Sequence, residues 1–267
     1  MKKFDITEYV IRTDKFCEEF SGYKFVLLSD LHSNSYKINL HEVNKVIHGE
    51  KPDAVLIAGD MFNGSIKDDV TDVMNFLIAL AKRYQIFYAL GNHEYKMKRE
   101  PDIYGNRFET IYEYLTEEGV CFLEDETVYL EKESEVLALS GVEIDSAFYK
   151  FRAPVMGKGL MDSHLGNVNK SIFNLLLAHN PEYFKNYARW GADLTLSGHI
   201  HGGIVRVPGI GGIISTTKKI LPQFDAGIYE TVSGRKMIIG RGLGTHTINI
   251  RINNRPELVI VKILAKK

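Results

Sequence analysis

Short apolar runs that alternate with amphipathic helical patterns constrain the fold of this chain more than any other feature. The runs at 23–29, 54–58 and 85–90 are short, apolar and bounded by polar or turn residues, as buried strands are. After them, apolar residues recur at helical spacing over 38–48, 68–82 and 108–118. Strand–helix repeats of about thirty residues build parallel sheets with helices outside. The first half is therefore predicted to be a β-α-β-α-β-α unit.

The second half of the chain is richer in strands. Further apolar runs lie at 136–140, 174–178, 193–197, 202–207, 227–232, 236–240 and 258–263. They predict a second sheet packed on the first. The chain has 267 residues, 45% of them hydrophobic, which suffices for a sizeable core, and no linker composition interrupts it. We therefore expect a single α/β domain over 1–267.

The charge and hydropathy of the sequence limit the binding partners and the cellular compartment that we expect for this protein. The formal net charge of -1 gives no global basic field for a nucleic acid. No uncharged apolar run is long enough to span a bilayer, and charged residues interrupt the N-terminal stretch, against a secretory signal peptide. Cys17 and Cys121 allow at most one disulfide, and Cys121 is expected in the core. These features predict a cytoplasmic protein that acts on a small molecule, and leave its oligomeric state open.

Polar, metal-ligating residue types follow five of the predicted strands directly. They are Asp30-Leu31-His32, Gly59-Asp60, Gly91-Asn92-His93-Glu94, His179-Asn180-Pro181 and Gly198-His199-Ile200-His201-Gly202. In open α/β sheets, ligands bind beyond the carboxyl ends of the strands. We therefore expect these five turns to open on one crevice.

The spacing and the chemistry of these residues indicate divalent metal ions. Residues two apart in an extended chain point to the same side, so Asp30 and His32 can face one ion together, as can His199 and His201. Each motif alone is ambiguous, since Asp-x-His at a strand end is usually a cap and Gly-Asp an ordinary turn. Together, in this order, they predict a metal centre. Mixed Asp, His and Asn donors suit Mn, Fe, Zn or Ni, and suit calcium poorly.

The series of motifs resembles the calcineurin-like metallophosphoesterase superfamily, over about residues 23–265. The segments LLAHNPEYF, GADLTLSGHIHGG and RGLGTHTINIRINNRPEL resemble its bacterial YkuE-like branch. The resemblance implies a four-layer α/β/β/α sandwich of two mixed sheets flanked by helices. This sequence differs from many related sequences in three ways. It has Ser33-Asn34 after the first motif, it has Ile200 and Ile204 in and after the last motif, and no export signal is expected. The departures leave compartment and substrate open.

The resemblance also implies a set of metal ligands. One ion would be held by Asp30, His32, Asp60 and His201, and the other by Asp60, Asn92, His179 and His199. Asp60 would bridge the two ions. His93, beside a ligand but not one itself, would contact the substrate phosphate or the leaving group.

The expected reaction is hydrolysis of a P–O bond by in-line attack of a metal-bridging hydroxide. Its catalytic residues are Asp60 and His93, the latter as general acid, and its substrate-binding residues are Asn92 and Arg206. Phosphodiester hydrolysis is favoured. The alternatives are a phosphomonoesterase, a nucleotide or lipid pyrophosphatase and, with less support, a nuclease or a non-catalytic scaffold of the same fold.

Other residues receive weaker assignments. Arg241 and Lys218-Lys219 are further candidate phosphate binders, with solvated surface charge as the alternative. The segment 143–170 is expected to be irregular, either a functional lid or a packed surface excursion. The remaining histidines do not fit the metal pattern: His41 and His48 are expected to be solvated, His164 lies in the irregular segment, and His246 is of uncertain role.

Overall fold

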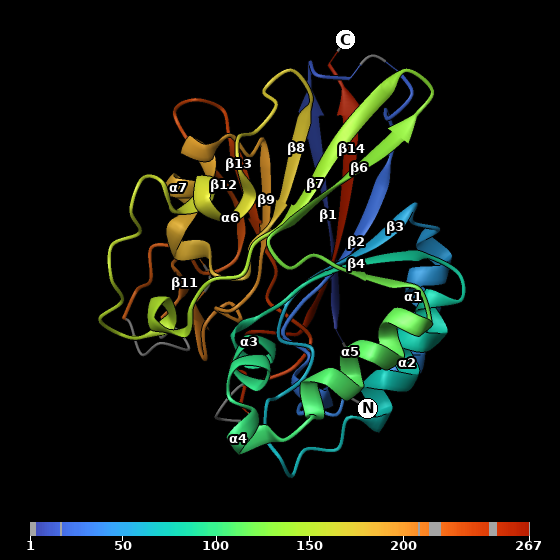
Figure 1. The fold of residues 1–267 in the computed structure, drawn as a ribbon, viewed down its shortest axis with the longest axis vertical. Coiled ribbons are helices and arrows are strands. Elements are labelled where there is room, and N and C mark those ends of the chain that lie inside the picture. The colour runs from blue at the N-terminus through green and yellow to red at the C-terminus, as the bar shows by residue number, and fades with distance from the viewer. Residues whose placement is uncertain (1–3, 17, 208, 214–219, 246–249, 267) are drawn as a thin grey trace.

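Two sheets pack face to face, and helices cover both outer faces (Figure 1). The computed structural model describes residues 4–16, 18–207, 209–213, 220–245 and 250–266. The first sheet contains the predicted parallel strands β2 (Lys24–Leu28), β3 (Ala54–Ala58) and β4 (Gln85–Ala89), extended by a parallel strand that was not predicted, β5 (Val120–Phe122). Beside β2 lie β14 (Glu257–Ala265), antiparallel to it, and then β1 (Asp5–Thr13), parallel to β14.

The second sheet is also mixed. β7 (Glu135–Gly141), β8 (Phe173–Leu177), β9 (Leu194–Ser197) and β13 (Lys236–Ile239) run parallel. β6 (Glu126–Lys132) and β12 (Gly227–Glu230) close the two edges as antiparallel strands. The register pairs Leu175 with Leu194, so the carboxyl ends of β8 and β9 lie side by side.

Alternation along the strands creates the layers. In β2, Phe25 and Leu27 face the second sheet, while Val26 and Leu28 face the helices. The first sheet is covered by α1 (Leu40–Glu50), α2 (Thr71–Ala81) and α5 (Arg107–Glu117), and the second by α6 (Leu160–Leu165) and α7 (Phe184–Trp190). The predicted α/β/β/α sandwich is confirmed.

Several elements have no counterpart in the sequence prediction, among them β1, β6 and a helix. β1 and β6 are edge strands in which charged and polar residues leave no more than three consecutive apolar residues; Ile6 of β1 is 50% exposed. The helix α3 (Asn92–Arg99) begins directly at the third motif and is followed by α4 (Pro101–Tyr104). Half-exposed edges and polar helices lack the periodicity on which the prediction depended.

Three expectations need correction. The strand expected over 202–207 is confined to β10 (Arg206–Val207), paired with β11 (Gly211–Gly212), because Gly202 and Gly203 adopt positive φ values of 70° and 83°. Cys121 is a free thiol that packs against the core between the sheets but is only partly buried, and Cys17 lies outside the described residues. His48 is half-buried, with Nδ1 3.0 Å from the Tyr84 hydroxyl, whereas His41 is exposed as expected.

The segment 143–170 is more ordered than expected. It contains a 3-10 turn, η2 (Ser146–Tyr149), and the helix α6. Met156 and Met161 are buried in the cluster that α7 forms on the second sheet, whereas Phe151 is 64% exposed. The later part of the segment is therefore a packed excursion, and only the part around Phe151 projects. Among the described residues, no helix has the length and hydropathy needed to cross a membrane.

Candidate metal centre

The five polar turns meet where the carboxyl ends of β2, β3, β4, β8 and β9 face one another. Backbone and side-chain hydrogen bonds join turns of different sheets. The backbone N–H of His199 donates to Asp30 Oδ1 at 2.9 Å, and His179 Nδ1 lies 2.6 Å from the carbonyl oxygen of Ala58. The crevice predicted from the sequence is therefore a seam between the two sheets, and both sheets contribute side chains to it.

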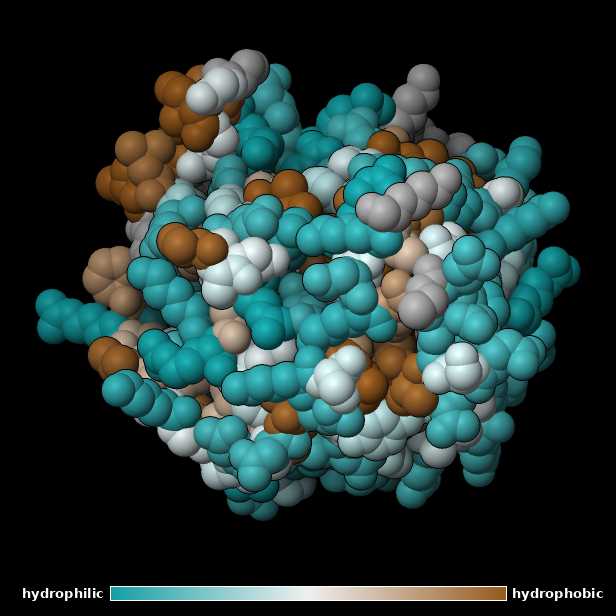
Figure 2. All heavy atoms as spheres, turned by 90° about the horizontal axis from the view of Figure 1, so that it is seen from above, coloured by the Kyte–Doolittle hydropathy of each residue, from teal (hydrophilic) through white to brown (hydrophobic). Residues whose placement is uncertain are grey.

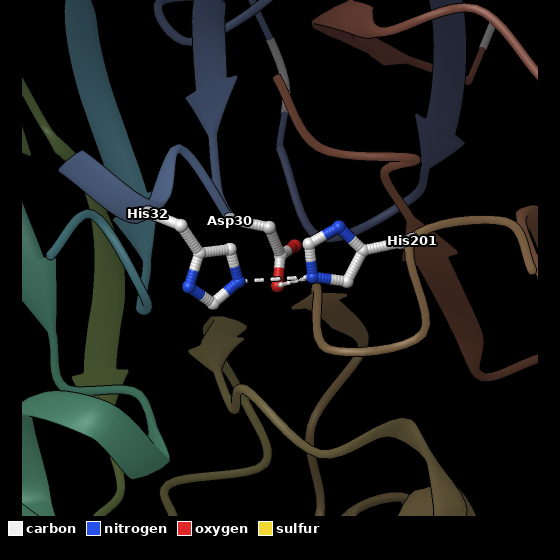
Figure 3. Close-up of side chains that lie close together, drawn as sticks. All are labelled: Asp30, His32 and His201. Atoms are coloured by element: carbon white, nitrogen blue, oxygen red, sulfur yellow. Dashed lines mark hydrogen bonds and ion pairs between the residues drawn. The ribbon is translucent and has the colours of Figure 1, made fainter. Parts of the chain in front are cut away.

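The first cluster consists of Asp30, His32 and His201, whose ligand atoms all lie within 4.8 Å of one another. Figure 3 shows the three side chains pointing toward a common centre. His32 Nε2 and His201 Nε2 are 3.0 Å apart, and His201 Nε2 lies 3.4 Å from Asp30 Oδ1. All three side chains are buried. Nitrogen and carboxylate oxygen atoms that converge in this way are the donors that a borderline divalent ion takes.

The second cluster consists of Asp60, His179 and His199, again with ligand atoms within 4.8 Å. His179 Nε2 lies 3.0 Å from Asp60 Oδ2. The same carboxylate oxygen lies 3.9 Å from His32 Nε2, so Asp60 stands between the two clusters. Asn92 Oδ1 is buried and has no hydrogen-bond partner among the described residues. The backbone N–H of the next residue, His93, donates to Asp60 Oδ1 at 3.0 Å. An orphaned buried acceptor in this turn fits a cation, because an unsatisfied buried polar atom is otherwise costly.

The backbone at this seam is strained. Five of the predicted ligands adopt positive φ values between 48° and 72°: Asp30, His32, Asp60, His199 and His201. A non-glycine residue in this region costs about 1–3 kcal/mol. The seam is also crowded, and residue 91 has to be glycine because a Cβ atom there would collide with the backbone and carboxylate of Asp60. Strain concentrated on the converging side chains is typical of a functional site.

The sequence pattern of the calcineurin-like phosphoesterases matches residues 23–203, more than half of the chain. This chain belongs to the calcineurin-like phosphoesterases. Its relatives include an uncharacterized metallophosphoesterase of Aquifex aeolicus, 28% identical over 98% of this chain and 92% of the relative. They also include YkuE of Bacillus subtilis, 26% identical over 96% of this chain and 84% of the relative. The family is dimetal-dependent and acts on phosphoesters, so this phosphoesterase is a metal-dependent hydrolase.

The fold has a counterpart among solved structures. The phosphopantetheinyl hydrolase PptH of Mycobacterium tuberculosis superposes with a TM-score of 0.51, over 85% of this chain and 90% of that one. The sequences are 14% identical, so the likeness concerns the fold alone. It agrees with the two mixed sheets flanked by helices described above.

A buried carboxylate that the sequence interpretation left without a role organises this phosphoesterase's site. Glu94 accepts hydrogen bonds from the backbone N–H groups of Asp60 at 2.9 Å, Phe62 at 3.0 Å and Gly91 at 3.0 Å. The Tyr88 hydroxyl donates to it as well, at 2.9 Å. Glu94 therefore ties the turn after β3 to the turn after β4. Its place three residues after Gly91, at the start of a helix, is the sequence signal that would have indicated a capping carboxylate.

Electrostatics in the metal-free site favour a positive charge between the clusters. Burial raises the pKa of Asp30 to about 6, although the His179 charge opposes this. Burial also opposes the charge of Asp60, but the surrounding His179, His93 and His32 hold its pKa well below the usual range. Burial alone would lower the pKa of His179, yet the Asp60 carboxylate, its hydrogen bond and Asp30 raise it to about 9. The raised pKa of His179 and the lowered pKa of Asp60 both indicate that the space between these side chains favours a positive charge.

His93 lies at the edge of the centre and is more accessible than the clustered side chains. Its Nδ1 lies 2.6 Å from the carbonyl oxygen of Asn63, and its Nε2 lies 3.9 Å from Asp60 Oδ2. The imidazole is 16% exposed, whereas that of His32 is fully buried. The hydrogen bond to Asn63 fixes the ring and directs Nε2 toward the reacting centre, as an acid or a phosphate contact requires.

The predicted basic residues are engaged in ion pairs. Arg206 lies 2.9 Å from Asp225 and donates to the carbonyl oxygen of Gly202 at 3.2 Å. Arg241 lies 3.0 Å from Glu257 and 3.2 Å from Asp5. Phosphate binding by Arg206 stays a prediction. Lys218, Lys219 and His246 lie outside the described residues.

Arg251 and Tyr149 contact predicted ligands without having been singled out in the sequence. Arg251 donates to the carbonyl oxygens of Gly244 and Arg241, at 2.9 and 2.8 Å, and one of its nitrogens lies 3.4 Å from His201 Nδ1. Burial lowers the pKa of Arg251 to about 10. The Tyr149 ring packs edge-on against His199, with centroids 4.9 Å apart. Neither residue belongs to a motif with its own mechanism, so the sequence offered no direct indication of either contact.

Proposed function

We propose that this phosphoesterase is a dinuclear metal-dependent phosphodiesterase. The observation that carries the proposal is the position of Asp60 between two buried clusters of donors. Asp30, His32, Asp60 and His201 would hold one divalent ion, and Asp60, Asn92, His179 and His199 the other. Such a pair of ions supplies Lewis acidity toward the phosphoryl oxygens and lowers the pKa of water near neutrality. The donor set favours Mn, Fe, Zn or Ni.

The protein's own residues orient the reacting groups. Glu94 and the fixed turns hold Asp60 in place, so its carboxylate keeps two cations from facing each other unshielded. His93, whose ring is held by the carbonyl oxygen of Asn63, would protonate the departing alkoxide from Nε2. Asn92 begins α3 with its amide oxygen turned into a buried, unsatisfied position. Arg206 is a further candidate contact for the phosphate, in exchange with its Asp225 partner.

The test is an assay of the purified protein with Mn²⁺ on bis-p-nitrophenyl phosphate and p-nitrophenyl phosphate, together with metal analysis. Cleavage of the diester, abolished by Asp60→Asn, supports the phosphodiesterase. Cleavage of the monoester alone makes the protein a phosphatase built on the same site. A protein that binds no metal overturns the proposal.

The role of His93 is tested separately with diesters of graded leaving groups. His93→Ala is expected to retain bound metal and to lower kcat, most strongly for the poorest leaving group, because a general acid matters most there. His41→Ala, an exposed histidine on α1, is the matched control and is expected to behave as wild type. Equal loss across all leaving groups would rule out the acid role.

A further inference from the structure

A cavity of about 510 Å³ lies between the segment around Phe151 and the stretch before β12. Its walls include Phe151, Ile220, Leu221, Pro222 and Phe224, which come from the projecting part of the 143–170 segment and from the stretch before β12. Ligand pockets commonly have volumes of about 300–1,000 Å³ and predominantly apolar linings. Phe151, Ile220 and Leu221 are 64%, 76% and 58% exposed, so the cavity keeps large apolar side chains in contact with water.

A second cavity of about 550 Å³ shares the lining residues Gln223 and Phe224 with the first. Phe184, Tyr229 and the fully exposed Val232 extend the apolar lining, and Lys185 and Glu230 also border it. Figure 2 shows hydrophobic side chains gathered at the left of that view, the side on which Figure 1 places α6, α7 and β12. Such gatherings on a protein surface mark binding sites.

The walls of the first cavity are joined to the metal centre by very short stretches of chain. Phe151 follows Tyr149 by two residues, and the Tyr149 ring rests on His199. Glu182, which also borders the cavity, follows the predicted ligand His179 by three residues. Two or three residues span at most about 7–11 Å. Two walls of the cavity are therefore tied by backbone to the turns that carry Tyr149 and His179, and a molecule with its phosphate at the metal centre could extend toward it.

The side chains that line the cavity determine which chemical group of a bound molecule it can accept. Ile220, Leu221 and Phe151 gain from burial only against an apolar partner. An alkyl or acyl group next to the scissile phosphate suits this lining.

We propose that the cavity binds the hydrophobic group of an amphiphilic phosphoester, so that the substrate is a phosphoester of a lipid-like alcohol. The inference rests on the proposed phosphodiesterase function. In the test reaction the oxygen of water attacks phosphorus and the bond from phosphorus to p-nitrophenolate breaks. The alkyl group remains esterified to the phosphate, in the cavity.

The experiment measures kcat/KM for p-nitrophenyl alkyl phosphodiesters from methyl to octyl, below their micellar concentrations and with Mn²⁺. Each buried methylene is worth up to about 0.8 kcal/mol, so kcat/KM is expected to rise about two- to fourfold per methylene until the cavity is filled. Phe151→Ser and Leu221→Ser are expected to flatten this rise and to leave the rate on the methyl ester unchanged. Ile103→Ser on α4, 55% exposed and outside the lining, is the matched control.

A chain-length dependence that is flat in wild type, or as steep in both variants as in wild type, overturns the proposal. If even the methyl ester is not hydrolysed, the phosphodiesterase function fails, and the cavity is judged by binding instead. The proposed apolar site is supported if octylphosphonate binds wild type at least tenfold more tightly than methylphosphonate does and this preference is absent in Phe151→Ser. Equal binding of the two phosphonates eliminates it.

Discussion

Replacing Glu94 with Gln tests whether one buried carboxylate holds the turns of the metal centre together. One carboxylate oxygen accepts from Phe62 N–H and the Tyr88 hydroxyl, and the other from Asp60 N–H and Gly91 N–H. A glutamine amide presents a donor on one side. In its better orientation the Tyr88 hydroxyl turns to accept, but the Phe62 N–H loses its acceptor.

The cost follows from those contacts. A buried donor left unsatisfied costs about 1–3 kcal/mol. The two remaining backbone bonds become neutral and lose about half their strength, which adds roughly 1 kcal/mol. Glu94→Gln is therefore expected to lower the free energy of unfolding by about 2–4 kcal/mol, measured by urea denaturation of the metal-free protein. Displacement of the Asp60 and Gly91 backbones is expected to reduce kcat/KM about 100-fold.

Tyr88→Phe is the matched control. It removes one donor to the same carboxylate and leaves the three backbone donors satisfied, so its cost is expected to be about 1–2 kcal/mol with kcat/KM close to wild type. Glu94→Gln within about 0.5 kcal/mol of wild type, or with undiminished turnover, would refute the reasoning.

Four further outcomes are expected. Because the pKa of His179 rises from 6.5 to about 9 in the metal-free protein and a ligand must be neutral, metal binding displaces a proton. The apparent affinity should therefore rise about tenfold per pH unit from about 6.5 until it levels near 9, and calorimetry showing constant affinity from pH 7 to 9 would contradict this. The same shift stabilises the metal-free fold fully below pH 6.5, and that contribution is lost as the pH rises through 9, so the Tm should fall over this interval. Gly91→Ala should lower metal content and activity through its collision with Asp60, and normal metal content in the variant would show that the turn yields freely. Arg251→Lys should lower the free energy of unfolding by about 1–3 kcal/mol, because hydrogen bonds to backbone carbonyl oxygens are lost. Arg255→Lys, at an exposed position, is the control and should not lower it. Equal urea midpoints for the two variants would contradict the prediction.

The sequence predicted what local pattern determines. The parallel strands β2, β3 and β4 are continuous apolar runs because both of their faces are buried, and the motifs stand out because each follows such a run directly. β1 was missed because its outward side chains face solvent at an edge.

The contacts that depend on tertiary structure were beyond the sequence. Glu94 and Arg251 form hydrogen bonds with backbone groups that only the fold brings close to them. The residue type alone does not predict these partners. The pairing of Arg206 with Asp225 is of the same kind. The apolar cavity joins segments about seventy residues apart, so no single stretch of sequence displays it.

The placement of β14 between β1 and β2 has a consequence for synthesis on the ribosome. β1 precedes the other strands of its sheet in the chain, yet its strand partner, residues 257–265, follows all of them. Until residues 257–265 have been synthesised, β1 has no strand partner in the sheet and β2 presents an open edge, the kind of edge that invites pairing with other chains. The growing chain can assemble β2 to β5 before then, but the first sheet is complete only once residues 257–265 have emerged. The edge of β2 is therefore open to mispairing throughout the synthesis of the intervening residues.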